Sequence, residues 1–174
     1  SGDYIVLKKS INASELMFLD SQYETVIASA VTTITGTTAD INTVYTAHAA
    51  GTITDLGNEA VTISDTTIAA SSLNTLDGNT TGSVNAASIT TLTGSLAEII
   101  QAYNSGGISG LGNEAITLND TTIAVATLNT LNGNTTGVIN ADTVTTLTGT
   151  AAEIISLFIG PGLQGITGLG DEDI

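Results

Sequence analysis

The chain of 174 residues contains no cysteine and no tryptophan, and aromatic residues make up only 3% of it. Without cysteine, neither disulfide bonds nor thiolate metal sites can form. Because large rings are scarce, a core has to be built from small aliphatic side chains, which stack in thin layers in solenoid proteins. Hydrophobic residues nevertheless make up 41% of the chain, and this content argues against intrinsic disorder.

Basic residues are almost absent. The chain has two lysines, Lys8 and Lys9, and no arginine. Together with 17 acidic residues this gives a formal net charge of −15. Such a surface repels phosphate backbones and anionic membranes, so we expect no nucleic-acid partner. The chain also has no apolar run long enough to span a membrane and no secretory signal peptide, so no membrane insertion is expected.

The main positive feature is a long internal repeat. Residues 57–103 recur 55 positions later as residues 112–158, and 30 of the 47 aligned pairs are identical. Self-similarity at this level indicates a tandem-repeat architecture. Residues 26–45 align without a gap on residues 84–103, which places an earlier, divergent copy at the beginning of the chain.

The repeats divide the chain into four parts. Residues 1–56 form a divergent first repeat, which is either a cap or a junction to another domain. Residues 57–111 form the second repeat, residues 112–166 the third, and residues 167–174 the start of a truncated fourth. Larger side chains in the first repeat, such as Met17 and Phe18, are typical of a capping repeat.

Each long repeat contains two short units with a common apolar spacing, and a glycine usually follows two residues after the last apolar position. In the second repeat these units are Ile68/Leu73/Leu76/Gly78 and Val84/Ile89/Leu92/Gly94. We expect each unit to form a short strand followed by a short α- or 3₁₀-helix that stops at the glycine. The β-branched run 89–93 also suits a strand, so the second unit has two interpretations.

Capping boxes predict a further helix in each long repeat. Ser95 with Glu98 and Thr150 with Glu153 have the serine or threonine and the acid three residues apart that this motif requires, and Thr37 with Asp40 is a weaker version. With the strands around it, this pattern predicts an α/β repeat solenoid of short strands and short helices. An all-β solenoid is the alternative.

The repeat texture resembles that of a known class of proteins. The runs GLGNEA, SDTTIAASSLNTLDGNTTG and VTTLTG look like tandem repeats of very long, acidic, Thr- and Gly-rich exported proteins, especially cyanobacterial ones. The resemblance implies an extracellular or cell-surface location and a spacer or adhesive function. It implies no catalytic residues.

Calcium is the one cofactor that the sequence suggests. Oxygen-rich segments recur at Asp65 and Asp120 and again at Asp77-Gly78-Asn79 and Asn132-Gly133-Asn134, and carboxylate and carbonyl oxygens are calcium ligands. Asp65 and Asp120 are the predicted ligands, because the repeat keeps both. Asp and Asn in turns also bond their own backbone, so these residues have a metal-free interpretation as well.

We found no pattern that predicts catalysis. His48 is the only histidine, and neither a nucleophile elbow nor a phosphate-binding loop is present. The sequence predicts a secreted structural or adhesive module of a large surface protein, without enzymatic activity. Its partners would be neighbouring repeats of the same chain and a surface or glycan ligand. The alternative function is a virion fibre or another component of an oligomeric assembly.

Overall fold

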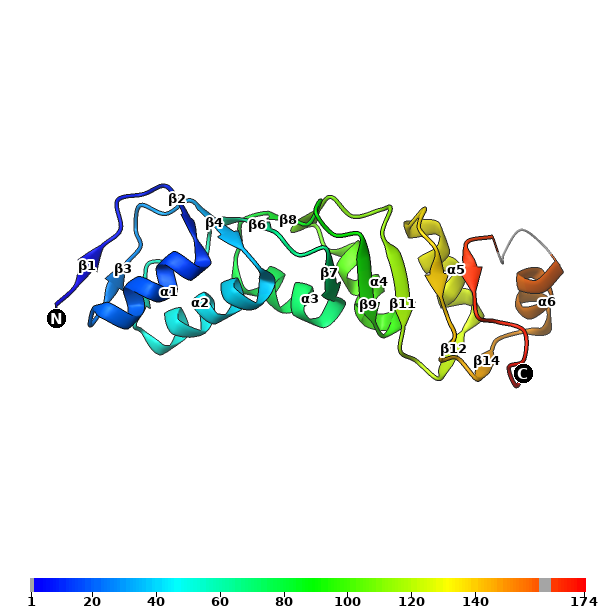
Figure 1. The fold of residues 1–174 in the computed structure, drawn as a ribbon. Coiled ribbons are helices and arrows are strands. Elements are labelled where there is room, and N and C mark those ends of the chain that lie inside the picture. The colour runs from blue at the N-terminus through cyan, green and yellow to red at the C-terminus, as the bar shows by residue number, and fades with distance from the viewer. Residues whose placement is uncertain (1, 160–163) are drawn as a thin grey trace. The chain divides into compact units, whose positions relative to one another are not determined.

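The computed structural model describes residues 2–159 and 164–174. Ser1 of the first repeat and residues 160–163 of the predicted third repeat lie outside the described residues. The fold is α/β, with short strands and short helices alternating in repeat-like β–α units (Figure 1). The predicted fold class is therefore confirmed, and the all-β alternative is wrong. The described part of the chain has no helix with the length and apolar character of a membrane span.

The chain forms two compact units. The first holds the segments up to Asp65, 72–88 and 105–110, and the second holds 66–71, 89–104 and the chain from Leu111 onward. The described residues contain six helices: α1 (Ala13–Gln22), α2 (Thr38–Ala50), α3 (Ala70–Asn79), α4 (Leu96–Asn104), α5 (Val125–Asn134) and α6 (Ala151–Ile159).

Within residues 2–159 and 164–174 the strands form four sheets, A to D, in which every pair is parallel. The first unit contains sheet A, with β1 (Tyr4–Ile5), β3 (Val26–Ile27) and β5 (Ile53–Thr54), and sheet B, with β2 (Ser10–Asn12), β4 (Thr33–Gly36), β6 (Ala60–Ile63), β8 (Val84–Asn85) and β10 (Ile108–Ser109). The second unit contains sheet C, with β7 (Thr67–Ala69), β9 (Thr91–Gly94), β11 (Ala115–Leu118), β13 (Ile139–Asn140) and β15 (Ile166–Thr167), and sheet D, with β12 (Thr122–Ala124) and β14 (Thr146–Thr148).

Paired strands lie one coil of chain apart. Ser10 pairs with Thr33 and Thr33 with Ala60, so these partners are 23 and 27 residues apart. Parallel strands need a crossover connection, and here a helix lies within it, as in other parallel β–α folds. A long repeat of 55 residues therefore makes two coils.

Three kinds of strand can be distinguished by their place in a coil. Pre-helix strands come directly before a helix, post-helix strands follow a helix, and opening strands, β6 and β11, begin the second and third long repeats. Sheet B has the order pre-helix β2 and β4, opening β6, post-helix β8 and β10. Sheet C has the same order with β7, β9, β11, β13 and β15. Each five-stranded sheet thus contains strands from two successive long repeats.

The core is made of aliphatic columns that run across the sheets. In sheet B, Ile11, Ile34, Val61 and Val84 are in register, and all are buried. In sheet C the corresponding column is Ile68, Leu92, Ile116, Ile139 and Ile166. One small branched side chain per strand fills each layer, which explains how a core forms with so few aromatic residues.

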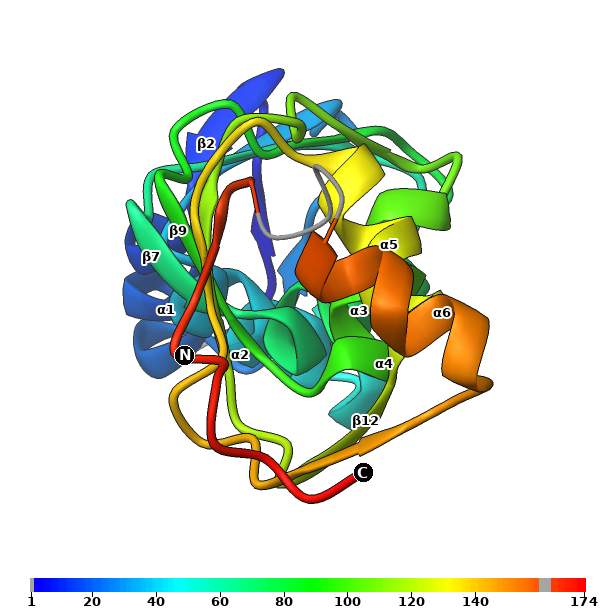
Figure 2. The same ribbon diagram turned by 90° about the vertical axis from the view of Figure 1, so that its right-hand side faces the viewer.

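The helices pack on their neighbours within each unit. In the first unit α1 lies beside α2 (Figure 1), and in the second α5 lies against both α4 and α6 (Figure 2).

The helices predicted from capping boxes are confirmed as α2, α4 and α6. In α4, Ser95 N–H donates to Glu98 Oε2 (2.9 Å) and Glu98 N–H donates back to the Ser95 hydroxyl (3.3 Å), which completes the box.

The structure corrects two details of the predicted short units. The first short unit of each long repeat is a strand and a helix, as expected, but Gly78 and Gly133 lie inside the last turns of α3 and α5 instead of stopping them. The second short unit contains no helix. In the second long repeat β8 is followed by β9, because the Thr-Leu-Thr run pairs on both sides with parallel strands.

Candidate functional site

Acidic residues flank the opening strands in both complete repeats. Glu59 precedes β6 and Asp65 follows it, and Glu114 and Asp120 flank β11 in the same way. Each acid contacts the capping-box helix that lies just before it in the chain, α2 or α4. The four residues form a polar arrangement that recurs in both repeats, and each pair is one candidate site.

Asp65 and Asp120 cap the N-termini of these helices from the following repeat. Thr38 donates to Asp65 Oδ2 from its backbone N–H (2.7 Å) and its hydroxyl (2.9 Å). The backbone N–H of Leu96 donates to Asp120 Oδ2 (2.7 Å). Thr38 and Leu96 are the first residues of α2 and α4, where backbone N–H groups have no partner inside the helix. A carboxylate at this end also interacts favourably with the helix dipole.

The predicted calcium ligands therefore have a structural function that needs no metal. The sequence pattern also suggested turns at Asp77 and Asn132, but these residues lie in the helices α3 and α5. Asp77 Oδ2 accepts a hydrogen bond from the Ser105 hydroxyl (2.6 Å). Within residues 2–159 and 164–174, no three His, Asp or Glu side chains gather closely enough to hold a metal ion. Calcium at Asp65 and Asp120 stays a prediction.

Glu59 and Glu114 are fully buried, with none of their surface exposed. Glu59 Oε2 accepts from the Gly57 N–H (2.9 Å) and from the Tyr45 hydroxyl (3.1 Å). Glu114 Oε2 accepts from the Gly112 N–H and from the Tyr103 hydroxyl, both at 2.8 Å. A buried carboxyl group is costly unless it is hydrogen-bonded, and these two contacts supply the bonds.

Both tyrosines respond to this environment. Burial is the largest cause that raises the pKa of Tyr45 above its ordinary value of 10.0, and the charge of Glu59 and its hydrogen bond to the phenol add to it. Burial likewise raises the pKa of Tyr103, and its hydrogen bond to Glu114 acts in the same direction. Each phenol thus remains a donor to its glutamate well into the alkaline range.

A threonine and a glycine from the next coil close each site. The Thr80 hydroxyl donates to the Glu59 carbonyl (2.7 Å) and accepts from the Gly82 N–H (3.0 Å). Thr135 and Gly137 repeat this around Glu114, at 2.8 and 2.9 Å. A Cβ atom on Gly82 or Gly137 would overlap the glutamate carbonyl, which explains why the Asn-Thr-Thr-Gly run ends in glycine in both copies.

Together these contacts fasten one helix at two points. Asp65 holds the N-terminus of α2, and Glu59 holds Tyr45, seven residues further along the helix. Because both acids belong to the next long repeat, the arrangement couples each capping-box helix to the coil that follows it. Chemically this is a set of positioned acceptors for backbone and hydroxyl donors of the same chain.

The third copy departs from the pattern. Phe158 stands where the others have tyrosine, so it has no hydroxyl to donate. Glu172, the counterpart of Glu114, is partly exposed and accepts from the Gly170 N–H (2.8 Å). The contact within the loop is therefore kept in the third copy, and the bond to the helix is lost.

Sequence reasoning missed Glu59 and Glu114. Burial of a glutamate cannot be read from composition, because this residue type is almost never fully buried without partners. A usable signal was present nevertheless: the run Gly-Asn-Glu-Ala is identical in two copies, and glutamate and aspartate stand six residues apart around an apolar strand in both. The tyrosines at positions 45 and 103 recur with them.

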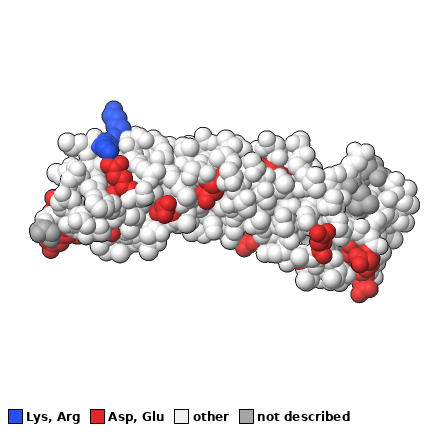
Figure 3. Space-filling model, viewed as in Figure 1, with Lys and Arg blue, Asp and Glu red and all other residues white. Residues whose placement is uncertain are grey.

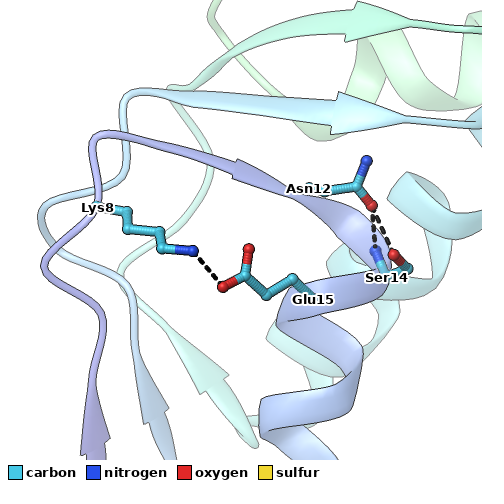
Figure 4. A network of polar contacts seen from close by, with 4 residues as sticks. All are labelled: Lys8, Asn12, Ser14 and Glu15. Carbon is cyan, nitrogen blue, oxygen red and sulfur yellow. Dashed lines mark hydrogen bonds and ion pairs between the residues drawn. The ribbon is translucent and has the colours of Figure 1, made fainter.

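Other polar groups singled out in the sequence have local contacts. His48 Nδ1 lies 3.0 Å from the Ile53 carbonyl oxygen. Lys8 forms an ion pair with Glu15, next to Asn12, whose side chain caps α1 by accepting from the Ser14 N–H (2.9 Å; Figure 4). On the face drawn in Figure 3 most of the acidic groups are separated by uncharged surface, and a larger acidic patch lies at the lower right.

The described residues form no pocket. No protein-family model, curated protein or solved structure matches the chain.

Proposed function

We propose that the chain is a structural or adhesive repeat module of a large extracellular surface protein, without catalytic activity. The observation that carries this proposal is the use of the recurring polar residues. Glu59, Asp65 and Thr80, with their counterparts Glu114, Asp120 and Thr135, bond one coil to another. A sequence that repeats these residues therefore repeats its coil-to-coil contacts, as an extendable array requires.

The surface composition supports an exported location. With two basic residues against 17 acidic ones, the molecule carries a charge that keeps it soluble in salt and repels it from phosphate-rich surfaces. The absence of cysteine makes folding independent of the redox state of the compartment. As partners we propose neighbouring repeats of the parent chain and a surface or glycan ligand.

Antibody labelling tests the location. Antibodies raised against this chain should label intact cells of the source organism, and brief protease treatment of those cells should remove the signal. Labelling that requires permeabilised cells would contradict a surface protein. A strain that lacks the parent gene should lose attachment or surface integrity while its growth in suspension is unchanged.

Single-molecule pulling tests the structural function. When the chain is stretched between its ends, coils held by neighbours should unfold in several steps, because each coil loses its contacts in turn. A Glu59→Gln/Glu114→Gln variant should unfold at lower force, and Asp171→Asn, at an exposed position, serves as the matched control. Release of the whole chain in one step at low force would contradict the proposal.

A further inference from the structure

The first repeat has an opening strand of its own, β1. Its Tyr4 pairs with Val26 of the post-helix strand β3. In the second repeat Val61 of β6 pairs in the same way with Val84 of the post-helix strand β8. Because Val26 and Val84 are equivalent in the alignment of the repeats, Tyr4 corresponds to Val61.

Hydrogen bonds give the same correspondence on the other side of the strand. The Lys9 carbonyl accepts from the N–H groups of Thr32 (2.7 Å) and Thr33 (3.0 Å). The Thr66 carbonyl accepts from the N–H groups of the equivalent residues 90 and 91, at 2.8 and 3.0 Å. Lys9 therefore has the place of Thr66, and the counterparts of the residues around β1 are fixed from both sides.

Both acids that fasten a capping-box helix are missing around β1. Gly2 stands where the second repeat has Glu59, and Lys8 stands where it has Asp65. Gly2 has no side chain that could accept a tyrosine hydroxyl, which would lose its partner on burial. Lys8 is a donor only, so it cannot accept a helix N–H. Its positive charge is also unfavourable at the positive end of a helix dipole.

Lys8 is bonded within its own repeat instead. Its ammonium group forms an ion pair with Glu15 in the first turn of α1 (Figure 4). Asp65, at the equivalent position, reaches back to α2, the helix that precedes its opening strand. The contact made from this position is therefore reversed in the first repeat, from the preceding helix to the following one.

Other contacts of β1 also stay inside the first repeat. The Tyr4 ring lies against Tyr23, with 4.7 Å between the ring centroids, where the second repeat has the smaller Val61. The Glu24 N–H donates to the Gly2 carbonyl (3.2 Å). Both contacts join β1 to the segment just before β3, so the strand is held without a preceding helix.

We infer that the first repeat is the cap of the array, an inference that rests on the proposed function. A capping-box helix stacked ahead of it would find neither of the acceptors that fasten α2 and α4. Gly2 and Lys8, and not the place of the repeat in the chain, make it a cap. Long repeats can therefore be added after the first repeat but not ahead of it, which gives the array one direction of extension.

One additional long repeat, placed at either of two positions, tests the inference. In one chain a copy of residues 57–111 is inserted between Leu111 and Gly112, so that the opening strand after it carries both acids. In the other, a copy of residues 57–112 is joined ahead of Ser1, which keeps the spacing from its last glycine to the Glu59 position. An isotope label confined to the added copy distinguishes its amides in hydrogen exchange.

The copy ahead of Ser1 should be the less protected one. Amides of its capping-box helix should exchange roughly tenfold faster, or more, than those of the inserted copy, because coils without coupled neighbours open locally. Gly2→Glu together with Lys8→Asp should return most of the protection. A side chain at Gly2 is sterically possible, since a Cβ atom there would meet nothing within 4 Å. Lys9→Asp has the same charge change at the place of Thr66 and should leave exchange fast.

A melt of the natural chain with Gly2→Glu and Lys8→Asp shows that the first repeat still folds, since only the exposed ion pair with Glu15 is lost. Equal protection of both added copies would overturn the inference and leave the proposed function standing. Fast exchange that the two substitutions do not slow would overturn it too. Fast exchange of the inserted copy as well would contradict the extendable array of the proposed function, and the cap with it.

Discussion

At the scale of single residues, threonine explains much of the unusual composition. Threonine hydroxyls recurrently donate to a backbone carbonyl one coil earlier, for example Thr90 to Thr66 (3.1 Å) and Thr145 to Thr121 (3.2 Å). Further donors of this kind are Thr81, Thr93, Thr136, Thr148 and Thr167. A β-branched side chain also suits a strand, so one residue type serves both the sheet and the contact between coils.

Two asparagines at equivalent positions differ in their contacts. Asn79 Nδ2 donates to Asn42 Oδ1 (3.1 Å), whereas Asn134 Nδ2 is buried with no hydrogen-bond partner among the described residues. The reason is a substitution on the preceding helix, because Ile100 stands where the earlier copy has Asn42. A buried donor without an acceptor costs stability, which the side-chain bond avoids in the other copy.

Asn79→Ala should therefore lower the free energy of unfolding by about 1 kcal/mol, while Asn134→Ala should leave it unchanged or raise it. Denaturant melts of the two single variants against the natural chain measure the difference. Equal losses at both positions would mean that the Asn42–Asn79 bond contributes nothing.

The buried tyrosines predict a loss of stability in alkali. Because burial raises the pKa of Tyr45 and Tyr103 in the folded state, the folded chain holds these protons more tightly than the unfolded chain does. The stability that the two protonated phenols contribute to the fold is fully present below pH 10.0, the ordinary pKa of tyrosine. It is lost as the pH rises above that value.

Melts between pH 8 and 12 measure this contribution. The Tyr45→Phe/Tyr103→Phe variant should be less stable at pH 8, because Glu59 and Glu114 lose a donor, but its stability should fall less steeply above pH 10. Tyr23→Phe is the matched control and should keep the slope of the natural chain. A double variant with that same slope would contradict the pKa argument.

At the scale of elements, the sequence predicts what local chemistry decides. The helices α4 and α6 could be placed because Ser95 and Thr150 begin capping boxes, which depend on residues three apart. The element after β8 could not be decided, because its apolar spacing fits a helix and its β-branched residues fit a strand. Pairing with β7 and β11 decides for a strand, and those partners are 24 residues away.

The caps supplied from the following repeat are a second feature that local patterns do not reveal. Asp120→Asn should cost about 1 kcal/mol, because the Leu96 N–H loses a charged acceptor at the N-terminus of α4. Asp142→Asn is the control, since this exposed aspartate also follows a strand but does not cap a helix of the preceding repeat. Denaturant melts of both variants provide the measurement.

Melts with and without calcium test whether these aspartates also bind the ion. If Asp65 and Asp120 bind calcium, millimolar calcium should raise the melting temperature of the natural chain above its value in a chelator, and more than magnesium does. Asp65→Ala should then abolish part of that gain. If the two melts of the natural chain coincide, Asp65 and Asp120 act as helix caps alone and the calcium prediction is wrong.

At the scale of the whole molecule, repeats in sequence and sheets in space do not coincide. The second long repeat supplies β6, β8 and β10 to sheet B and β7 and β9 to sheet C. The sequence predicted the repeat boundaries from identity alone. It could not predict that an opening strand pairs with pre-helix strands of the preceding repeat, because that contact depends on how coils stack and not on any local pattern.

This interlocking predicts which part of a shortened chain survives. Deleting residues 112–174 removes β11, β13 and β15 and leaves sheet C with β7 and β9, and it removes both acids that fasten α4. Sheets A and B keep all their strands, since β10 ends at Ser109.

The fragment of residues 1–111 should therefore melt lower and more broadly than the whole chain, because coils without neighbours open first. Hydrogen exchange should locate the loss: amides of β9 and α4 should exchange at least tenfold faster, while those of β4 and β6 keep most of their protection. Removal of residues 171–174 alone is the control and should leave β9 protected. A fragment that melts as sharply and as high as the whole chain, with β9 still protected, would show that the coils do not depend on their neighbours.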